Sequence, residues 1–418
     1  MNLKRIILNF IHLFRPIYVP ICTCIRKVFK STSVVFCTCK FIRRVSNPIF
    51  RNYISQYRNP VEQTTERAPD HPIINLPVHV LGPLNKGKII MLMKHDASYA
   101  GIGAIWVYYL NRLAFSDRMG FHHVFECTKN MYYQEEHPVH GITNVFEYYF
   151  QQPSKISLKD AYKSNCVVMD WNNPEYGYND FWNASGTDNY EFKDRDINEY
   201  ARLQRKYFHL QPWVEKQLEE NIKDLLSDCK TLGVHARGAD TKMKYKNHPA
   251  IVSVEDYIRA AKKARCAIGA KKIFLATDDE EMLLSFQNAF GTDLLYYKDV
   301  IRSKGTVMNC YIEEKRDNHR YNLGLEAIRD VYTLAACQGL VCGISCISFV
   351  AQVLKRSKGE KYKVLKRLSN GVNKEGRNML SEKDRQAVRN EWSKELGRET
   401  DERSFARRQK VFDKNSMR

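Results

Sequence analysis

The sequence has no uninterrupted apolar run of the roughly 20 residues that a membrane-spanning helix needs. Its most apolar stretch, residues 6–25, is broken by polar, charged and proline residues: Asn9, His12, Arg15, Pro16 and Pro20. The clean apolar core and small-residue cleavage site of a signal peptide are also missing. Because basic residues accompany the apolar ones, we expect residues 1–57 to form an arm that lies on an anionic membrane surface. A poor type II signal-anchor and a basic disordered arm are the alternatives.

The 12 cysteines lack the spacing of a usual zinc knuckle. The pairs Cys22–Cys24 and Cys37–Cys39 are Cys-x-Cys rather than Cys-x₂₋₄-Cys, so thiols without a ligand role are favoured over zinc. Cys166, Cys337 and Cys342 lie in apolar runs, where a free thiol packs as a small hydrophobe. For a long chain without a clear signal peptide we expect reduced cysteines and a cytoplasmic protein, which the N-terminal arm would associate with a membrane. A Golgi type II membrane protein is the alternative.

The charge balance is strongly basic, at +19 over 418 residues. Such a surface favours nucleic acid, anionic lipid or phosphate-bearing ligands, and charge alone does not choose among them. No nucleic-acid-binding module is recognisable, so we expect no nucleic-acid partner, and a non-enzymatic nucleic-acid binder remains only an alternative. At 44% apolar and 27% charged residues the composition is globular, and the length favours two domains plus extensions.

Strand-like and helix-like segments alternate along the chain. In the first half the pattern predicts strands at 88–93, 121–126 and 165–170 and a helix at 104–115. In the second half it predicts strands ending near 235, 277, 297 and 344, with helices between them. This is an α/β class with parallel, Rossmann-like sheets. We therefore expect a first Rossmann-like domain at 58–205, a second at 206–370, and a charged helical tail at 371–418.

Polar residues follow three of the predicted strands. His235, Arg237 and Asp240 follow the first, Asp278 and Asp279 the second, and the 345–348 loop the third. Ligands bind outside the carboxyl ends of parallel strands, where such loops converge. An arginine fork matches phosphate oxygens, and the start of a helix adds a favourable dipole. The three loops therefore predict a nucleotide-diphosphate site anchored by Arg237.

Several motifs resemble the α1,6-fucosyltransferase family, which includes the N-glycan core enzyme and the rhizobial nodulation enzyme. They are Gln211–Lys216, Gly233–Arg237, Phe274–Asp279, Asn318–Tyr321, and Asp330 ahead of Leu340–Cys342. Gly101-x-Gly103 is similar to the family's glycine-rich entry loop, although a tight turn explains it equally well. The likeness covers about 85–130 and 205–355. Where the family usually has two adjacent arginines, this chain has Arg237-Gly238.

The resemblance implies a GT-B architecture, with two Rossmann-like domains facing across a cleft, the first on the acceptor side. It also implies GDP-fucose as donor, inversion at the sugar carbon, a glycan or glycolipid-linked acceptor, and neither a metal nor a cofactor. The donor-binding residues would be His235, Arg237, Asp278, Asp279, Asp330, Ser345, Cys346 and Ser348. Arg237 would bind the diphosphate. Asp240 is our first candidate for the base that deprotonates the acceptor, with Glu313 or Glu314 second.

Structural roles compete with these assignments. His235 would serve as a buried strand-end residue, Asp330 as a helix-to-loop anchor, and Asp278 with Asp279 as a helix cap. The aromatic stretch 171–190 has the composition of a sugar-binding loop or of an ordinary surface loop. The missing second arginine also leaves open a different donor, such as GDP-mannose or a UDP- or TDP-sugar.

Overall fold

The computed structural model describes residues 78–377 and 387, except 96–99, 129, 131, 171–193, 228, 239–241, 247, 306–308, 310–311 and 313–315. By its internal contacts the chain divides into two units, residues 1–62 and 63–418, and the described residues all belong to the second. The predicted N-terminal arm, the 171–190 loop and most of the predicted tail lie outside the described residues. No helix within the described ranges is long and apolar enough to cross a membrane.

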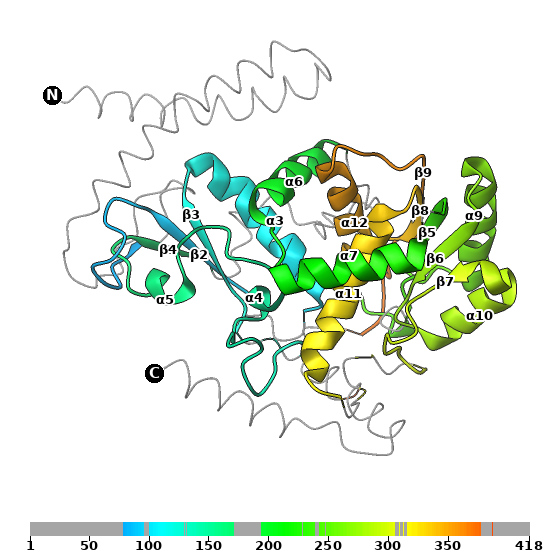
Figure 1. Cartoon of the computed structure of the whole chain (residues 1–418), viewed down its shortest axis with the longest axis horizontal. Coiled ribbons are helices and arrows are strands. Elements are labelled where there is room, and N and C mark those ends of the chain that lie inside the picture. The colour runs from blue at the N-terminus through cyan, green and yellow to red at the C-terminus, as the bar shows by residue number, and fades with distance from the viewer. Residues whose placement is uncertain are drawn as a thin grey trace, which may run out of the picture. The chain divides into compact units, whose positions relative to one another are not determined.

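The first half of the described chain builds a four-stranded sheet of order β1-β4-β2-β3 (Figure 1). Its strands are β1 (Val78–His79), β2 (Ile90–Lys94), β3 (His122–Glu126) and β4 (Val167–Asp170). β2 pairs in parallel with β3 and β4, whereas β1 pairs antiparallel with β4. Helix α3 (Ile102–Met119) packs on this sheet, and Tyr109 stacks on Phe125 with ring centroids 4.1 Å apart. The short helices α4 (Val145–Tyr149) and α5 (Leu158–Ala161) pack against β3.

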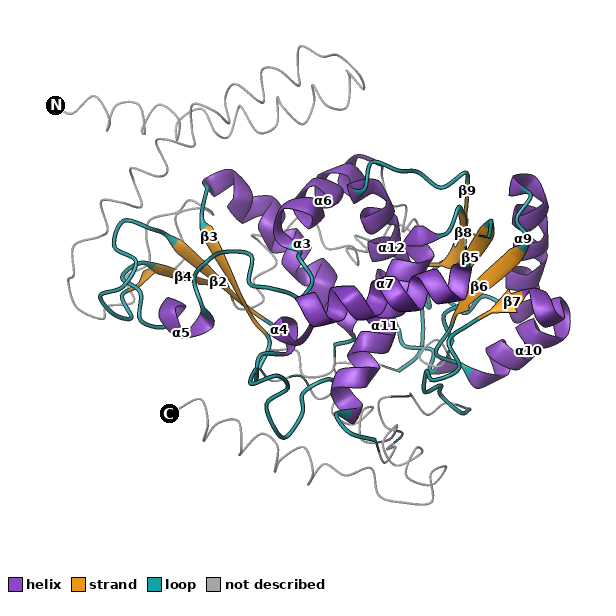
Figure 2. Cartoon of the chain, viewed as in Figure 1, coloured by secondary structure: helices purple, strands orange, loops and turns teal. Residues whose placement is uncertain are grey.

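The second half builds a five-stranded, fully parallel sheet of order β7-β6-β5-β8-β9 (Figure 2). Its strands are β5 (Thr231–His235), β6 (Lys272–Ala276), β7 (Leu294–Leu295), β8 (Gly339–Gly343) and β9 (Val364–Leu368). Every residue of β5 and β8 is buried, as expected for central strands covered on both faces. The predicted α/β class with parallel sheets is therefore confirmed.

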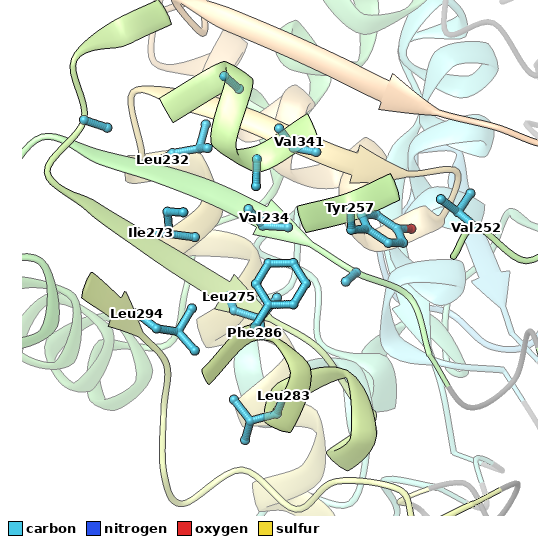
Figure 3. Packing of buried hydrophobic residues seen from close by; sticks show 14 residues of the cluster. Leu232, Val234, Val252, Tyr257, Ile273, Leu275, Leu283, Phe286, Leu294 and Val341 are labelled. Carbon is cyan, nitrogen blue, oxygen red and sulfur yellow. The ribbon is translucent and has the colours of Figure 1, made fainter. Parts of the chain in front are cut away.

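Helices cover both faces of the five-stranded sheet. On one face lie α9 (Val254–Ile268) and α10 (Glu280–Phe290), which the 3₁₀ turn Gly291–Asp293 follows. Leu232, Val234 and Val341 of the strands pack there with Tyr257 and Phe286 (Figure 3). On the other face lie α11 (His319–Ala336) and α12 (Cys346–Ser357). Pleating points alternate residues to opposite faces, so Gly233 faces α11, where a Cβ would lie 3.1 Å from Leu334.

Helices also join the two halves. α6 (Asp194–Tyr207) packs against α12 and α3, and α11 and α12 of the second half also contact α3 of the first; α7 (Pro212–Leu226) packs against α11 within the second half. The Trp106 indole N–H of α3 donates to Gln204 Oε1 of α6 at 2.7 Å. The predicted domain boundary between residues 205 and 206 therefore falls inside helix α6.

The start of the predicted tail is not helical. Residues 371–377 run alongside the 245–250 loop, where Val372 pairs with Pro249 and Arg377 with Tyr245. The Ala250 N–H donates to the Gly371 carbonyl at 2.9 Å, and the Lys246 N–H donates to the Arg377 carbonyl at 2.9 Å. This strap (residues 368–377) therefore runs along part of the chain between β5 and α9.

Candidate functional site

The carboxyl ends of β5 and β8 form the topological switch point of the five-stranded sheet. The helix that follows β5 is α9, on one face, and the helix that follows β8 is α12, on the opposite face. The chain therefore winds outward in opposite directions from this pair of neighbouring strands. In open α/β sheets the crevice at such a point is where ligands bind.

Arg237 occupies this switch point. It follows β5 by two residues, and its half-buried guanidinium donates from Nη1 to the Ile344 carbonyl, after β8, at 3.3 Å. Arg237, Tyr257, Gly343 and Ile344 line a small pocket that is partly open to solvent. Leu368 and Ser369 of the strap complete its wall. The arginine that the sequence singled out thus lines a pocket in the place where a parallel sheet binds ligands.

The start of α12 lies beside this arginine. Ser345 caps the helix: its Oγ accepts from the Ser348 N–H at 3.1 Å, and its own N–H donates to Ser348 Oγ at 3.2 Å. His235 is buried, with Nδ1 3.3 Å from Ser345 Oγ. Capping fixes the helix end and its positive dipole at the switch point. The Ser345 and Ser348 hydroxyls and the His235 ring therefore have structural partners, and their contact with a donor stays a prediction.

Helices α3 and α12 meet at their first turns. The glycine-rich segment begins α3, and the 345–348 loop begins α12. A Cβ on Gly103 of α3 would lie 3.1 Å from Cys346 Cβ and 3.1 Å from the Ile347 nitrogen of α12. The Ile102 N–H at the start of α3 donates to the Tyr133 hydroxyl at 3.0 Å. Gly103 therefore serves a close contact between helices, which brings two positive helix ends together near Arg237.

Both predicted aspartates contact protein groups. Asp278 Oδ1 accepts from the Gly238 N–H at 3.1 Å. Asp279 is 2% exposed, caps α10 by accepting from the Met282 N–H at 3.1 Å, and pairs with Lys242 Nζ at 2.6 Å. Lys242 carried no signal in the sequence, because the pattern shows neither which carboxylate it meets nor that the carboxylate is buried.

Asp330 belongs to a second group of charges, which Arg329 and Glu326 of the same helix α11 and Arg302 of the segment before it complete. Burial raises the pKa of its carboxyl to about 7, although Arg329 and Arg302 act in the opposite direction. Arg329 pairs with Asp299 at 2.7 Å. No described contact links Asp330 to the pocket residues, so its donor-binding role stays a prediction. The candidate bases Asp240, Glu313 and Glu314 lie outside the described residues.

Tyr257 and Ser369 are among the pocket residues that the sequence did not anticipate. Tyr257 of α9 places its hydroxyl over Gly343, and burial raises the pKa of this phenol, so it remains protonated at neutral pH. Ser369 follows β9, an edge strand that the sequence pattern did not reveal. Within the described ranges, no group of three or more His, Cys, Asp or Glu side chains is placed to hold a metal ion.

No family model matches the sequence. Several solved structures are similar to it, and they are fucosyltransferases. NodZ α-1,6-fucosyltransferase soaked with GDP-fucose is 16% identical over 64% of this chain and 92% of its own, with a TM-score of 0.38. NodZ from Bradyrhizobium is 14% identical over 64% and 92%, with a TM-score of 0.36. POFUT1 in complex with GDP-fucose is 11% identical over 69% and 99%, with a TM-score of 0.38.

The name of the first of these structures is that of the activity of the family that the sequence motifs resemble.

Proposed function

We propose that this chain is an inverting GT-B glycosyltransferase that transfers fucose from GDP-fucose to a glycan or glycolipid-linked acceptor. One observation carries the proposal: the Arg237 guanidinium lies at the switch point beside the capped start of α12. A guanidinium and a helix N-terminus together suit a diphosphate. The 206–370 half would hold the donor, the 58–205 half would face the acceptor, and the two would border a cleft.

The proposed reaction breaks the bond between the fucose anomeric carbon and the β-phosphate oxygen. The bonding electrons go to that oxygen, and the new negative charge develops on GDP beside Arg237. An acceptor hydroxyl oxygen attacks the anomeric carbon from the opposite face, which inverts its configuration. The hydroxyl proton passes to a base, for which Asp240 is the first candidate and Glu313 or Glu314 the second.

Preorganised charge at the leaving group is the main contribution of the protein in this scheme. Removing one such donor costs about 3–4 kcal/mol of transition-state stabilisation in well-studied sites. Arg237 and the α12 dipole supply positive charge from the chain itself, so the scheme requires neither a metal nor a cofactor.

The test is transfer of labelled fucose from GDP-fucose to a panel of glycan and glycolipid acceptors, followed by linkage analysis of the product. We expect transfer with inverted anomeric configuration, and its loss in Arg237→Ala. Product with retained configuration, or turnover in Arg237→Ala close to that of the wild type, would contradict the scheme.

A different nucleotide sugar is the second candidate, because Gly238 stands where the family carries another arginine. A thermal-shift panel of GDP-, UDP- and TDP-sugars distinguishes the two, since a ligand at 100 times its Kd stabilises the fold by about 2.7 kcal/mol. Stabilisation by UDP or TDP compounds but not by GDP would favour this alternative.

We also propose that the chain binds an anionic membrane surface, through its predicted N-terminal arm and through a row of lysines. Exposed Lys271 and Lys230 precede β6 and β5, and exposed Lys358, Lys361 and Lys363 precede β9, all at the amino edge of the five-stranded sheet. The Lys271 N–H donates to the Lys230 carbonyl at 2.8 Å, so these two are direct neighbours. Each lysine near an anionic bilayer contributes about 1 kcal/mol of attraction.

Vesicle co-sedimentation tests the lysine row. We expect Lys361→Glu with Lys363→Glu to weaken binding to phosphatidylserine vesicles, and added salt to weaken it further. The matched control reverses two exposed lysines of α7, Lys216 and Lys223. Equal binding by both variants would remove the row from the proposal.

A further inference from the structure

Gly238, the residue after Arg237, contacts both aspartates that follow β6. Asp278 accepts a hydrogen bond from the Gly238 N–H at 3.1 Å. The Gly238 backbone lies against Asp279 so closely that a Cβ at residue 238 would overlap the Asp279 Cβ. One carboxylate therefore holds the turn by a hydrogen bond, and the other supports it by contact.

Lys242 forms ion pairs with two carboxylates at the start of α10. Its ammonium pairs with the buried Asp279 carboxylate at 2.6 Å and with the exposed Glu281 carboxylate at 2.8 Å. Burial opposes the charge, yet these carboxylates outweigh it and raise the pKa of Lys242, so the ion pair persists at neutral pH. Asp279, which begins α10, thus contacts Gly238 on one side and pairs with Lys242 on the other.

We propose that Asp279 and Lys242 are positioning residues that hold the Arg237 guanidinium at the switch point. The inference rests on the proposed function, because it assigns Arg237 to the donor diphosphate. It gives Asp279 a role in aligning the arginine, not in contacting the nucleotide. It also explains Gly238. Because Asp279 packs against this residue, a second arginine side chain has no room there, and the site relies on the single guanidinium of Arg237.

A purely structural Asp279 is the competing explanation, and two substitutions separate it from positioning. Asp279→Asn keeps a good helix cap, because asparagine and aspartate cap equally well, but it loses the ion pair. Lys242→Gln loses the same pair without touching the cap. Lys242→Arg restores the charge. Glu281→Gln is the matched control, because it removes only the exposed partner of the same lysine, and exposed pairs contribute little.

The experiment measures GDP affinity by calorimetry, steady-state kinetics with GDP-fucose, and thermal unfolding without ligand, for every variant. We expect Asp279→Asn and Lys242→Gln to lower kcat by on the order of 10- to 100-fold, as misplacement by about 1 Å does. GDP affinity should fall with kcat, while the unfolding temperature of Asp279→Asn changes little. Lys242→Arg should recover most of the loss, and Glu281→Gln should behave as the wild type.

The outcomes separate a failure of the proposed function from a failure of the positioning role alone. If Arg237→Ala leaves GDP affinity unchanged, the proposed function itself fails. If Arg237→Ala weakens GDP binding but Asp279→Asn and Lys242→Gln do not, only the positioning role is overturned. A loss of kcat that tracks a lowered unfolding temperature, without rescue by Lys242→Arg, would likewise show that the pair serves stability alone.

Discussion

Arg237 Nη1 donates to the carbonyl oxygen of Ile344 at 3.3 Å. This bond ties the loop after β5 to the loop after β8 at the one place in the five-stranded sheet where the winding reverses. It brings a permanent positive charge to the capped start of α12. The contacts around this switch point are open to test by substitution.

Introducing the second arginine of the family should harm the site. In Gly238→Arg the new Cβ would overlap that of Asp279, and overpacking of this kind costs about 1–3 kcal/mol. We expect calorimetry to show weaker GDP binding than in the wild type, despite the added positive charge. Tighter binding would mean that the turn tolerates a side chain, and that Asp279 does not limit it.

Gly343 and Tyr257 should show strong energetic coupling. A Cβ on residue 343 would overlap the Tyr257 hydroxyl oxygen, so Gly343→Ala should lower the free energy of unfolding. Adding Tyr257→Phe removes that oxygen and should recover much of the loss. Urea unfolding of both single variants and the double variant gives the coupling, which we expect to be about 1 kcal/mol or more. Additive effects would contradict the contact.

The junction of α3 and α12 should tolerate no bulk at residue 103. Gly103→Val would press on Cys346 and Ile347, and we expect a loss of about 1–3 kcal/mol in the free energy of unfolding. Gly101→Ser is the control: the nearest atom to a Cβ there is the Tyr133 hydroxyl at 3.7 Å, and serine is favoured at a helix cap. Equal effects of the two changes would refute a specific contact at Gly103.

Asp330 should make stability fall as the pH rises. Burial raises the pKa of its carboxyl to about 7, whereas an unfolded aspartate titrates near 3.9. Between these values the folded state keeps a proton that the unfolded chain has lost, so the unfolding free energy falls with rising pH and levels off above the folded pKa. Asp330→Asn has no carboxyl at this position and therefore lacks this contribution to the pH dependence of the unfolding free energy. The stability of the wild type relative to Asp330→Asn should therefore decline from about pH 4 to about pH 7; a rise would contradict it.

Much of the fold was predictable because the central strands are short apolar runs with polar boundaries. β5, β6 and β8 and the helices α9, α10 and α12 lie within a few residues of their predicted positions. β9 was missed because it is an edge strand whose Leu365 and Lys366 are exposed, so its apolar pattern is weak. α6 was missed because most of its residues are charged or polar, and packing against α12 and α3 supports it.

The convergence of the strand-end loops was predictable, whereas the contacts of their side chains were not. Strand-end loops converge in any parallel sheet, so Arg237 and Ser345 could be placed together from order alone. What Asp279 contacts could not be read from the pattern, because a carboxylate beside a turn serves a ligand or the protein equally well in sequence. Its burial and its pairing with Lys242 bring together residues that lie 37 positions apart in the sequence.

GDP titration of the wild type and of Arg237→Ala, at one pH and ionic strength, tests the central claim most directly. If the Arg237 guanidinium holds the diphosphate, the substitution should raise the Kd by on the order of 10- to 100-fold, as expected for the loss of hydrogen bonds to a charged group. Lysine at this position should recover part of the affinity, since it keeps the charge without the fork. Equal Kd values for the wild type and Arg237→Ala, with both proteins folded, would contradict the account.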